Sequence, residues 1–72
     1  MDQLTREIND LQNEKDGLIG KIVNLDSYLM EHTLFIGHEK EYLRTQRSIM
    51  MSYVQMLDLR INELKQYQKK HN

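Results

Sequence analysis

Apolar residues recur along the first half of the chain in alternating steps of four and three positions. Steps that average 3.5 residues place side chains on one face of an α-helix, where they can pack into a facing helix. We therefore predict an amphipathic helix over about residues 2–31. The residues of this stripe are Leu4, Ile8, Leu11, Lys15, Leu18, Ile22, Leu25 and Leu29.

Lys15 is the one charged member of this stripe. A lysine in a helical seam commonly lays its aliphatic stem along apolar surface and extends its amine to water, which fixes the register of the helices. The alternative is a buried functional amine. The spacing alone is compatible with either role.

The segment that follows the first helix breaks the pattern. Its β-branched and aromatic run and the glycine at position 37 both disfavour a continued helix. We predict a short connection over about residues 32–38. Leu34, Phe35 and Ile36 are expected to fill the closed end of the molecule, with Phe35 as a core residue.

A second apolar line, at seven-residue intervals, indicates another helix over about residues 39–68. Its members are Leu43, Met50, Leu57 and Leu64, and the chain contains no proline. Two helices of about 30 residues would each extend roughly 45 Å. Helices of equal length joined by a short link are typical of an antiparallel hairpin. The predicted fold is therefore all-α, with residues 1–72 forming a single helical hairpin.

The shortness of the chain makes oligomerisation the expected means of stabilisation. A domain of this size buries only about 60% of the surface that its unfolded chain exposes. The chain has no cysteine, and its three histidines lack the spacing of a zinc site. We therefore predict a homo-oligomeric helical bundle, a dimer or a tetramer. The residues expected in its core are Leu4, Leu11, Leu18, Ile22, Leu25, Leu43, Met50 and Leu57.

Charge and hydropathy narrow the classes of partner. Residues 1–36 carry three basic and seven acidic side chains, whereas residues 37–72 carry seven basic and four acidic ones. This imbalance favours attraction between antiparallel helices, but it is too weak for general binding of DNA or RNA polymers. No stretch is apolar enough to span a membrane, and the first residues are too polar for a signal peptide. The expected location is the cytoplasm.

The residues that could perform catalysis show no specific arrangement. The serines and histidines do not form a nucleophile–base pair with a recognisable spacing, and no glycine-rich phosphate loop is present. The carboxylates lie mostly at outward positions and show no paired acid and base. We therefore do not expect an enzyme, a metal site or a cofactor.

A basic cluster at the start of the second helix is a candidate anion site. Lys40, Arg44 and Arg47 follow one another at spacings of four and three residues and share a helix face. The N-terminus of a helix attracts anions, and guanidinium groups can grip a phosphate with two hydrogen bonds. The alternative is that these side chains form ion pairs with the acidic first helix.

Polar residues also recur at seven-residue intervals, at Gln46, Tyr53 and Arg60. An ideal bundle is expected to carry leucine at these positions. A polar line there indicates either a hydrogen-bonded lock on the register or a ligand site. An aromatic ring beside an arginine can stack on a base and hold its phosphate.

The second helix resembles a family of very short phage-encoded helical proteins, first catalogued in crAss-like phages. The residues that carry the resemblance are Phe35 and the run Leu43-x₂-Gln46-x₃-Met50-x₂-Tyr53-x₃-Leu57-x₂-Arg60-Ile61. The segment Ile36-Gly37-His38 departs from the family, because it lacks the usual leucine–serine start to the second helix.

Similar small phage proteins include immune-evasion sponges, notably the anti-CBASS type. These are helical homo-oligomers that hold cyclic dinucleotide signals without cleaving them. The resemblance implies a phage protein that sequesters a cyclic dinucleotide between the subunits of a tetramer. The candidate ligand-binding residues are Lys40, Arg44, Gln46, Arg47, Tyr53 and Arg60.

Two other functions remain open at this stage. The chain could be an inhibitor or adaptor that lays a helix face on a host protein, or a purely structural coiled-coil oligomer. The feature that separates these functions is whether Arg44, Arg47 and Tyr53 face one shared cavity or separate surfaces.

Overall fold

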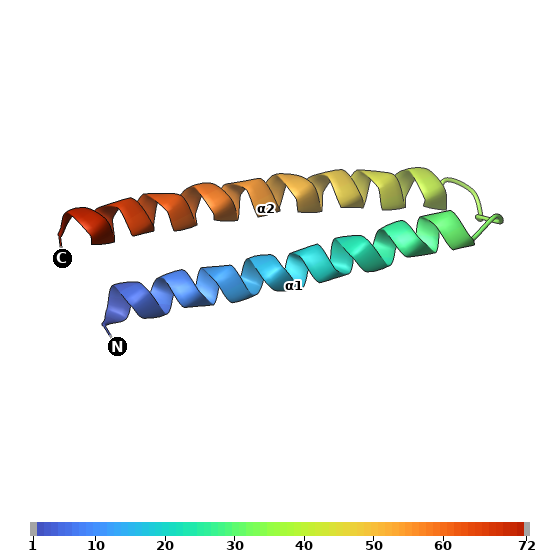
Figure 1. Cartoon of the computed structure of the whole chain (residues 1–72). Helices are drawn as coiled ribbons and strands as arrows, with labels where there is room; N and C mark the ends of the chain where they lie inside the picture. The colour runs from blue at the N-terminus through green and yellow to red at the C-terminus, as the bar shows by residue number, and fades with distance from the viewer. Residues whose placement is uncertain (1, 72) are drawn as a thin grey trace.

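The chain folds into two antiparallel α-helices joined by a short connection. A computed structural model describes residues 2–71. Its first helix, α1, spans Gln3–Glu31, and its second, α2, spans Glu39–Lys70. The helices lie side by side, and the start of α1 and the end of α2 lie at the same end of a rod (Figure 1) whose Cα atoms extend over 54 × 17 × 14 Å. The prediction of an all-α helical hairpin is confirmed.

Local hydrogen bonds set the ends of α1. The side chain of Asp2 accepts a hydrogen bond of 2.7 Å from the backbone N–H of Thr5, which satisfies one of the free N–H groups of the first turn. At the other end, His32 is extended and its N–H donates to the carbonyl of Tyr28. The helix therefore begins one residue later than the expected position 2 and ends at the expected position 31.

The connection reverses the chain before α2. Gly37 has a φ of 58°, a left-handed conformation that glycine adopts at little cost. At its far end α2 continues two residues beyond the expected position 68. No proline or glycine follows Tyr67 to stop the helix, and Lys69 and Lys70 in the last turn interact favourably with the helix dipole. The expected domain, residues 1–72, includes residues 1 and 72, which lie outside the described residues.

The core is one seam between the two helices. Its positions in α1 are those of the stripe from Leu4 to Leu29, and its positions in α2 are Leu43, Arg47, Met50, Val54, Leu57, Ile61, Leu64 and Gln68. Leu57 is fully excluded from solvent at its centre, and burial of such a side chain contributes about 1.5–3 kcal/mol. All eight residues expected in an oligomer core lie in this seam of a single chain, three buried and five partly buried, so α1 and α2 cover each other there. The buried residues are Ile8, Leu11, Ile22, Val54, Leu57 and Ile61.

The closed end of the hairpin differs from the expectation. Leu34 and Ile36 are 86% and 88% exposed, so the prediction that they fill this end is wrong. Two helices alone leave no enclosed space at the end of their seam for three further side chains. Phe35 is half-buried, with its ring edge-on to Tyr28 at 6.0 Å between centroids, and the ammonium of Lys40 lies 5.7 Å from its centre.

Candidate functional site

The residues that flank the seam fall on two opposite sides of the hairpin. In an antiparallel pair, residues directly before the seam positions of both helices share one side, and residues directly after them share the other. Tyr53 and Glu14 precede seam residues, and the hydroxyl of Tyr53 donates a hydrogen bond to the Glu14 carboxylate. Asp26 and Asp58 follow seam residues. We call these the Tyr53 side and the Asp26 side.

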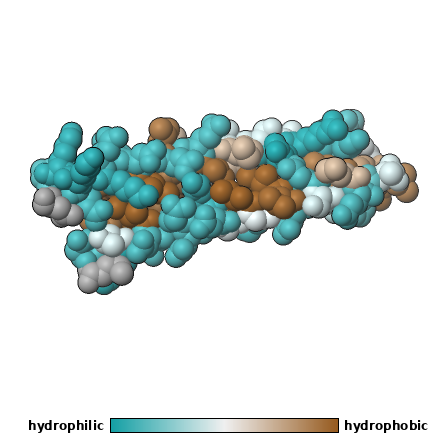
Figure 2. Space-filling view, in the orientation of Figure 1, coloured by the Kyte–Doolittle hydropathy of each residue, from teal (hydrophilic) through white to brown (hydrophobic). Residues whose placement is uncertain are grey.

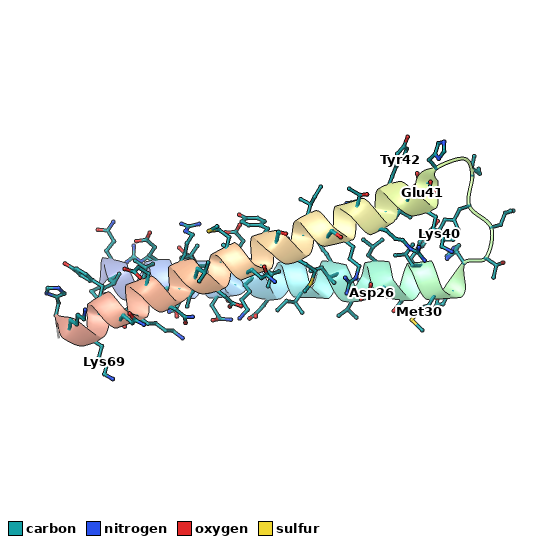
Figure 3. The ribbon with its side chains drawn as sticks, turned by 90° about the horizontal axis from the view of Figure 1, so that it is seen from above. Asp26, Met30, Lys40, Glu41, Tyr42 and Lys69 are labelled. Carbon is teal, nitrogen blue, oxygen red and sulfur yellow. The ribbon has the colours of Figure 1, made fainter. Side chains whose placement is uncertain are left out.

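The basic cluster lies toward the Asp26 side, and two of its three members already have partners. The guanidinium of Arg47 donates to both carboxylate oxygens of Asp26, at 2.5 and 3.3 Å. This hydrogen bonding, together with the charge of Asp26, raises the pKa of Arg47. Lys40 lies at the start of α2 (Figure 3), and its ammonium lies over the ring of Phe35. Of the three, Arg44 alone is exposed with neither an ion pair nor a cation–π contact to another residue in the range 2–71.

Arg47 therefore forms an ion pair with the acidic first helix. This was the alternative to the binding of a phosphate by the basic cluster. Arg47 forms this pair from a seam position, between Leu43 and Met50, where both it and its neighbours are only partly exposed. A phosphate would have to compete with the carboxylate of Asp26 for this guanidinium. Of the cluster, Arg44 is the member best placed to meet an anion.

The polar line lies on the other side of α2. Gln46, Tyr53 and Arg60 each directly precede a seam residue and are exposed, with Tyr53 43% exposed. Within the single hairpin they lie beside the seam, because Val54 and Ile61 occupy the seam positions. The hydrogen bond to Glu14 is the main cause that raises the pKa of Tyr53.

The six candidate ligand residues consequently do not converge within one chain. Arg44 and Arg47 lie toward the Asp26 side, whereas Tyr53 lies on the opposite side. Two clefts of about 430 and 380 Å³ mark the open and closed ends of the hairpin, and neither is lined by any of the six. Arg44, Arg47 and Tyr53 thus face separate surfaces, and a single chain does not enclose a ligand with them.

The polar line belongs to a longer pattern that the sequence reasoning did not assemble. On the Tyr53 side, α2 carries a second set of positions in alternating steps of four and three, each directly before a seam position. The signal was available, because Tyr42, Ile49 and Met56 also recur every seven residues. We call this set the outer stripe. Its members are Tyr42, Gln46, Ile49, Tyr53, Met56, Arg60, Glu63 and Tyr67.

The apolar members of the outer stripe are open to solvent. Tyr42 and Ile49 are each 66% exposed, and Met56 and Tyr67 are 53% and 56% exposed. Tyr42 projects from α2 on one side of the hairpin and Met30 from α1 on the other (Figure 3). Figure 2 shows the opposite face of the hairpin, the Asp26 side, where apolar side chains between hydrophilic borders also reach the surface. The hairpin therefore leaves a long apolar and aromatic surface on α2 uncovered.

Other chemistry finds little support in the described part of the chain. Among residues 2–71 no three side chains gather in an arrangement that could hold a metal ion. None of the helices there is both long and apolar enough to cross a membrane. The histidines instead make local contacts, such as that of His38 with Glu41 at 3.0 Å and the stacking of His32 on Tyr28.

Comparison with known proteins places the chain in a family. The model of the Sequestin family matches residues 7–63. This range contains most of α1, the whole connection and α2 as far as Glu63, so it includes the Arg47–Asp26 pair and most of the outer stripe. Neither the curated proteins nor the solved structures gave a match. Because the family model matches most of the chain, the chain is a member of the Sequestin family.

Proposed function

We propose that this chain is a non-catalytic phage immune-evasion protein that binds and sequesters a cyclic dinucleotide signal as a homo-oligomer. Membership of the Sequestin family supports the sequestering role. The resemblance of the second helix to small phage proteins supports the ligand class. The observation that carries the proposal is the exposed line Gln46, Tyr53 and Arg60, none of which is part of the buried seam of the hairpin.

The chemistry of this line suits a cyclic dinucleotide. The half-exposed ring of Tyr53 can stack on a base, since every nucleobase offers a flat π-face. The guanidinium of Arg60 can donate two parallel hydrogen bonds to a phosphate. The amide of Gln46 adds a donor and an acceptor for a base edge. Binding of this kind breaks no bond and needs no nucleophile or general base.

A shared site between copies follows from the shape of one chain. The Cα atoms of the hairpin extend over only 17 × 14 Å across its long axis, and Tyr53 and Arg60 are exposed on its surface. A sequestered ligand needs to be covered on more than one side. A two-fold symmetric ligand is also well matched to a two-fold interface between identical chains.

Thermal unfolding with a panel of nucleotides tests the proposal. The panel contains cyclic dinucleotides, cyclic mononucleotides and linear dinucleotides at equal concentration. A ligand at 100 times its dissociation constant adds about 2.7 kcal/mol to the free energy of unfolding. The bound ligand, released by heat, is expected to be chemically intact. A wild-type protein whose melting curve responds to no nucleotide would contradict the proposal.

Variants of Tyr53 separate its ring from its hydroxyl group. Tyr53→Leu is expected to weaken ligand binding by about 1–3 kcal/mol because the stacking platform is lost. Tyr53→Phe keeps the ring and is expected to retain most of the affinity. Leu59→Ala is the matched control, since Leu59 is an exposed residue of α2 outside the outer stripe. Equal affinity of the Leu and Phe variants would exclude stacking by this residue.

The exposed apolar residues favour one other function. Ile49 and Met56 on the outer stripe would also fit a helix of a host protein, as in an inhibitor or adaptor. This function predicts no response to any nucleotide and a chain that stays monomeric until the host protein is added. The nucleotide panel and a measurement of the molecular mass therefore distinguish the two.

A further inference from the structure

We infer that a second copy of this chain packs on the outer stripe, with the two α2 helices antiparallel about a two-fold axis. The inference rests on the homo-oligomer in the proposed function and names the surface and direction of the contact. The stripe runs from Tyr42 to Tyr67, which is roughly 38 Å along the helix. It is therefore nearly as long as the seam with α1.

The pattern of α2 is that of a helix with two neighbours. Its inner seam and its outer stripe both follow steps of four and three, offset by one residue. A helix with two such stripes packs against two other helices, because each stripe presents side chains for interlocking contact. The hairpin supplies one neighbour, α1. Exposed residues such as Ile49 and Met56 indicate that the second neighbour is absent from the single chain.

Charge identifies the helix that occupies the outer stripe. On the same side of the hairpin, α1 presents acidic residues near its start, Glu7, Asp10 and Glu14. Contact between the α1 helices of two copies on this side would cover little apolar surface, and a parallel contact would also bring these like charges together. Contact between two α2 helices avoids this repulsion and covers the apolar residues of both copies.

Charge also selects the direction of the two α2 helices. A parallel pair in register sets Arg60 against Arg60 and Glu63 against Glu63, and both contacts are repulsive. In an antiparallel pair whose two-fold axis passes between residues 53 and 56, no two residues of like charge face each other. We call each pair of facing residues a layer. The layers are Tyr42 with Tyr67, Gln46 with Glu63, Ile49 with Arg60, and Tyr53 with Met56.

This arrangement completes the candidate ligand site across the interface. Within one chain, Tyr53 and Arg60 are seven residues apart, or roughly 10 Å along the helix. In the antiparallel pair, Tyr53 lies about four residues, roughly 6 Å along the axis, from Arg60 of the second copy. Each copy thus supplies the guanidinium beside the other copy's ring, and the axis creates two equivalent half-sites, one for each half of a two-fold symmetric ligand.

The molecular mass of variants in solution tests the surface. Sedimentation equilibrium without nucleotide is expected to give a multiple of the 8.7 kDa chain mass for the wild type. Met56→Lys is expected to reduce the assembly, because it places two lysines beside the axis. Leu59→Lys is the matched control, since Leu59 is 64% exposed on α2 but outside the stripe. Circular dichroism checks that both variants remain helical.

Two outcomes of this measurement would overturn the inference. One is a wild-type protein that is monomeric at all concentrations. The other is a Met56→Lys variant that assembles as the wild type does, or that is affected no more than Leu59→Lys. If Met56→Lys also loses its helicity, Met56→Gln, which keeps a neutral side chain of similar length, is measured in its place.

Cysteine pairing tests the direction, because the natural chain has no cysteine. Chains with Gln46→Cys and chains with Glu63→Cys, when mixed, are expected to form a mixed disulfide. In the antiparallel pair the two copies of residue 46 lie roughly 25 Å apart along the axis, beyond the Cα separation of about 7 Å that a disulfide spans. Rapid self-pairing of either variant alone would instead show a parallel pair.

These experiments need no ligand, so they separate the interface from the proposed function. An antiparallel pair that binds no nucleotide would leave the interface established and contradict the sponge function. Nucleotide binding by a protein whose cysteines pair differently would retain the function and overturn the interface.

Discussion

The guanidinium of Arg47 binds the carboxylate of Asp26 from a seam position of α2, across the contact between the two helices. Both side chains are about two-fifths exposed, at 38% and 42%. The same residue was a candidate for holding a phosphate. Its position in the seam gives it a structural partner in the chain itself, and this changes what its substitution should do.

Arg47→Ala is expected to lower the midpoint of thermal unfolding, because it removes both hydrogen bonds to Asp26 and the packing of the arginine stem. Arg44→Ala is the matched control, and it should leave the midpoint of the free protein unchanged. In a double-mutant cycle, Asp26→Ala combined with Arg47→Ala should lower the free energy of unfolding by less than the sum of the two single changes. Additive losses would show that the pair does not interact in solution.

Leu57→Ala is expected to unfold most of the protein at room temperature. Leu57 is fully buried at the centre of the seam, and removal of such a side chain costs about 2–5 kcal/mol. Leu59→Ala, two residues away and 64% exposed, should change the free energy of unfolding by less than about 0.5 kcal/mol. Urea unfolding followed by circular dichroism measures both. Similar losses in the two variants would mean that the seam is placed on the wrong face of α2.

Lys15→Leu is expected to stabilise the hairpin. Lys15 occupies a seam position with its side chain 22% exposed, and its ammonium lies 2.5 Å from a carboxylate oxygen of Asp58. Replacement of a partly buried ion pair by apolar packing is often stabilising, here by about 1 kcal/mol, since Asp58 remains well exposed to water. Unfolding in urea gives the free energy. A clear loss of stability would show that the ion pair, and not the stem, holds the register.

The cap of α1 predicts a specific dependence on pH. The hydrogen bond from the N–H of Thr5 lowers the pKa of Asp2 below its ordinary value. Because the pKa is lowered on folding, the stabilisation is fully present above the unfolded value of about 3.9 and is lost as the pH falls through the folded pKa. Asp2→Asn keeps an acceptor but does not titrate, so its melting curve should lose this part of the acid dependence. An identical acid profile in both proteins would contradict the prediction.

The sequence by itself determined the two helices, their connection and their antiparallel arrangement. The heptad pattern from Leu4 to Leu29 gathers most of the apolar residues of α1 on one face, and this is the face that the hairpin buries. Gly37, the only residue described with a positive φ, follows an aromatic and β-branched run that ends the first pattern. These signals are local, and local spacing is sufficient to define an element.

Only the tertiary structure decided which neighbouring line of α2 joins Leu43, Met50 and Leu57 in the seam with α1. The line through Val54 and Ile61 and the line through Tyr53 and Arg60 are one residue apart, and a rotation of the helix by about 100° exchanges them without any change in periodicity. The choice depends on what α1 offers across the contact. Apolar side chains pack best on Val54 and Ile61, and Asp26 pairs with Arg47 only in that rotation. This complementarity joins residues that are distant in the sequence. The spacing of residues within α2 alone therefore does not predict which of the two lines enters the seam.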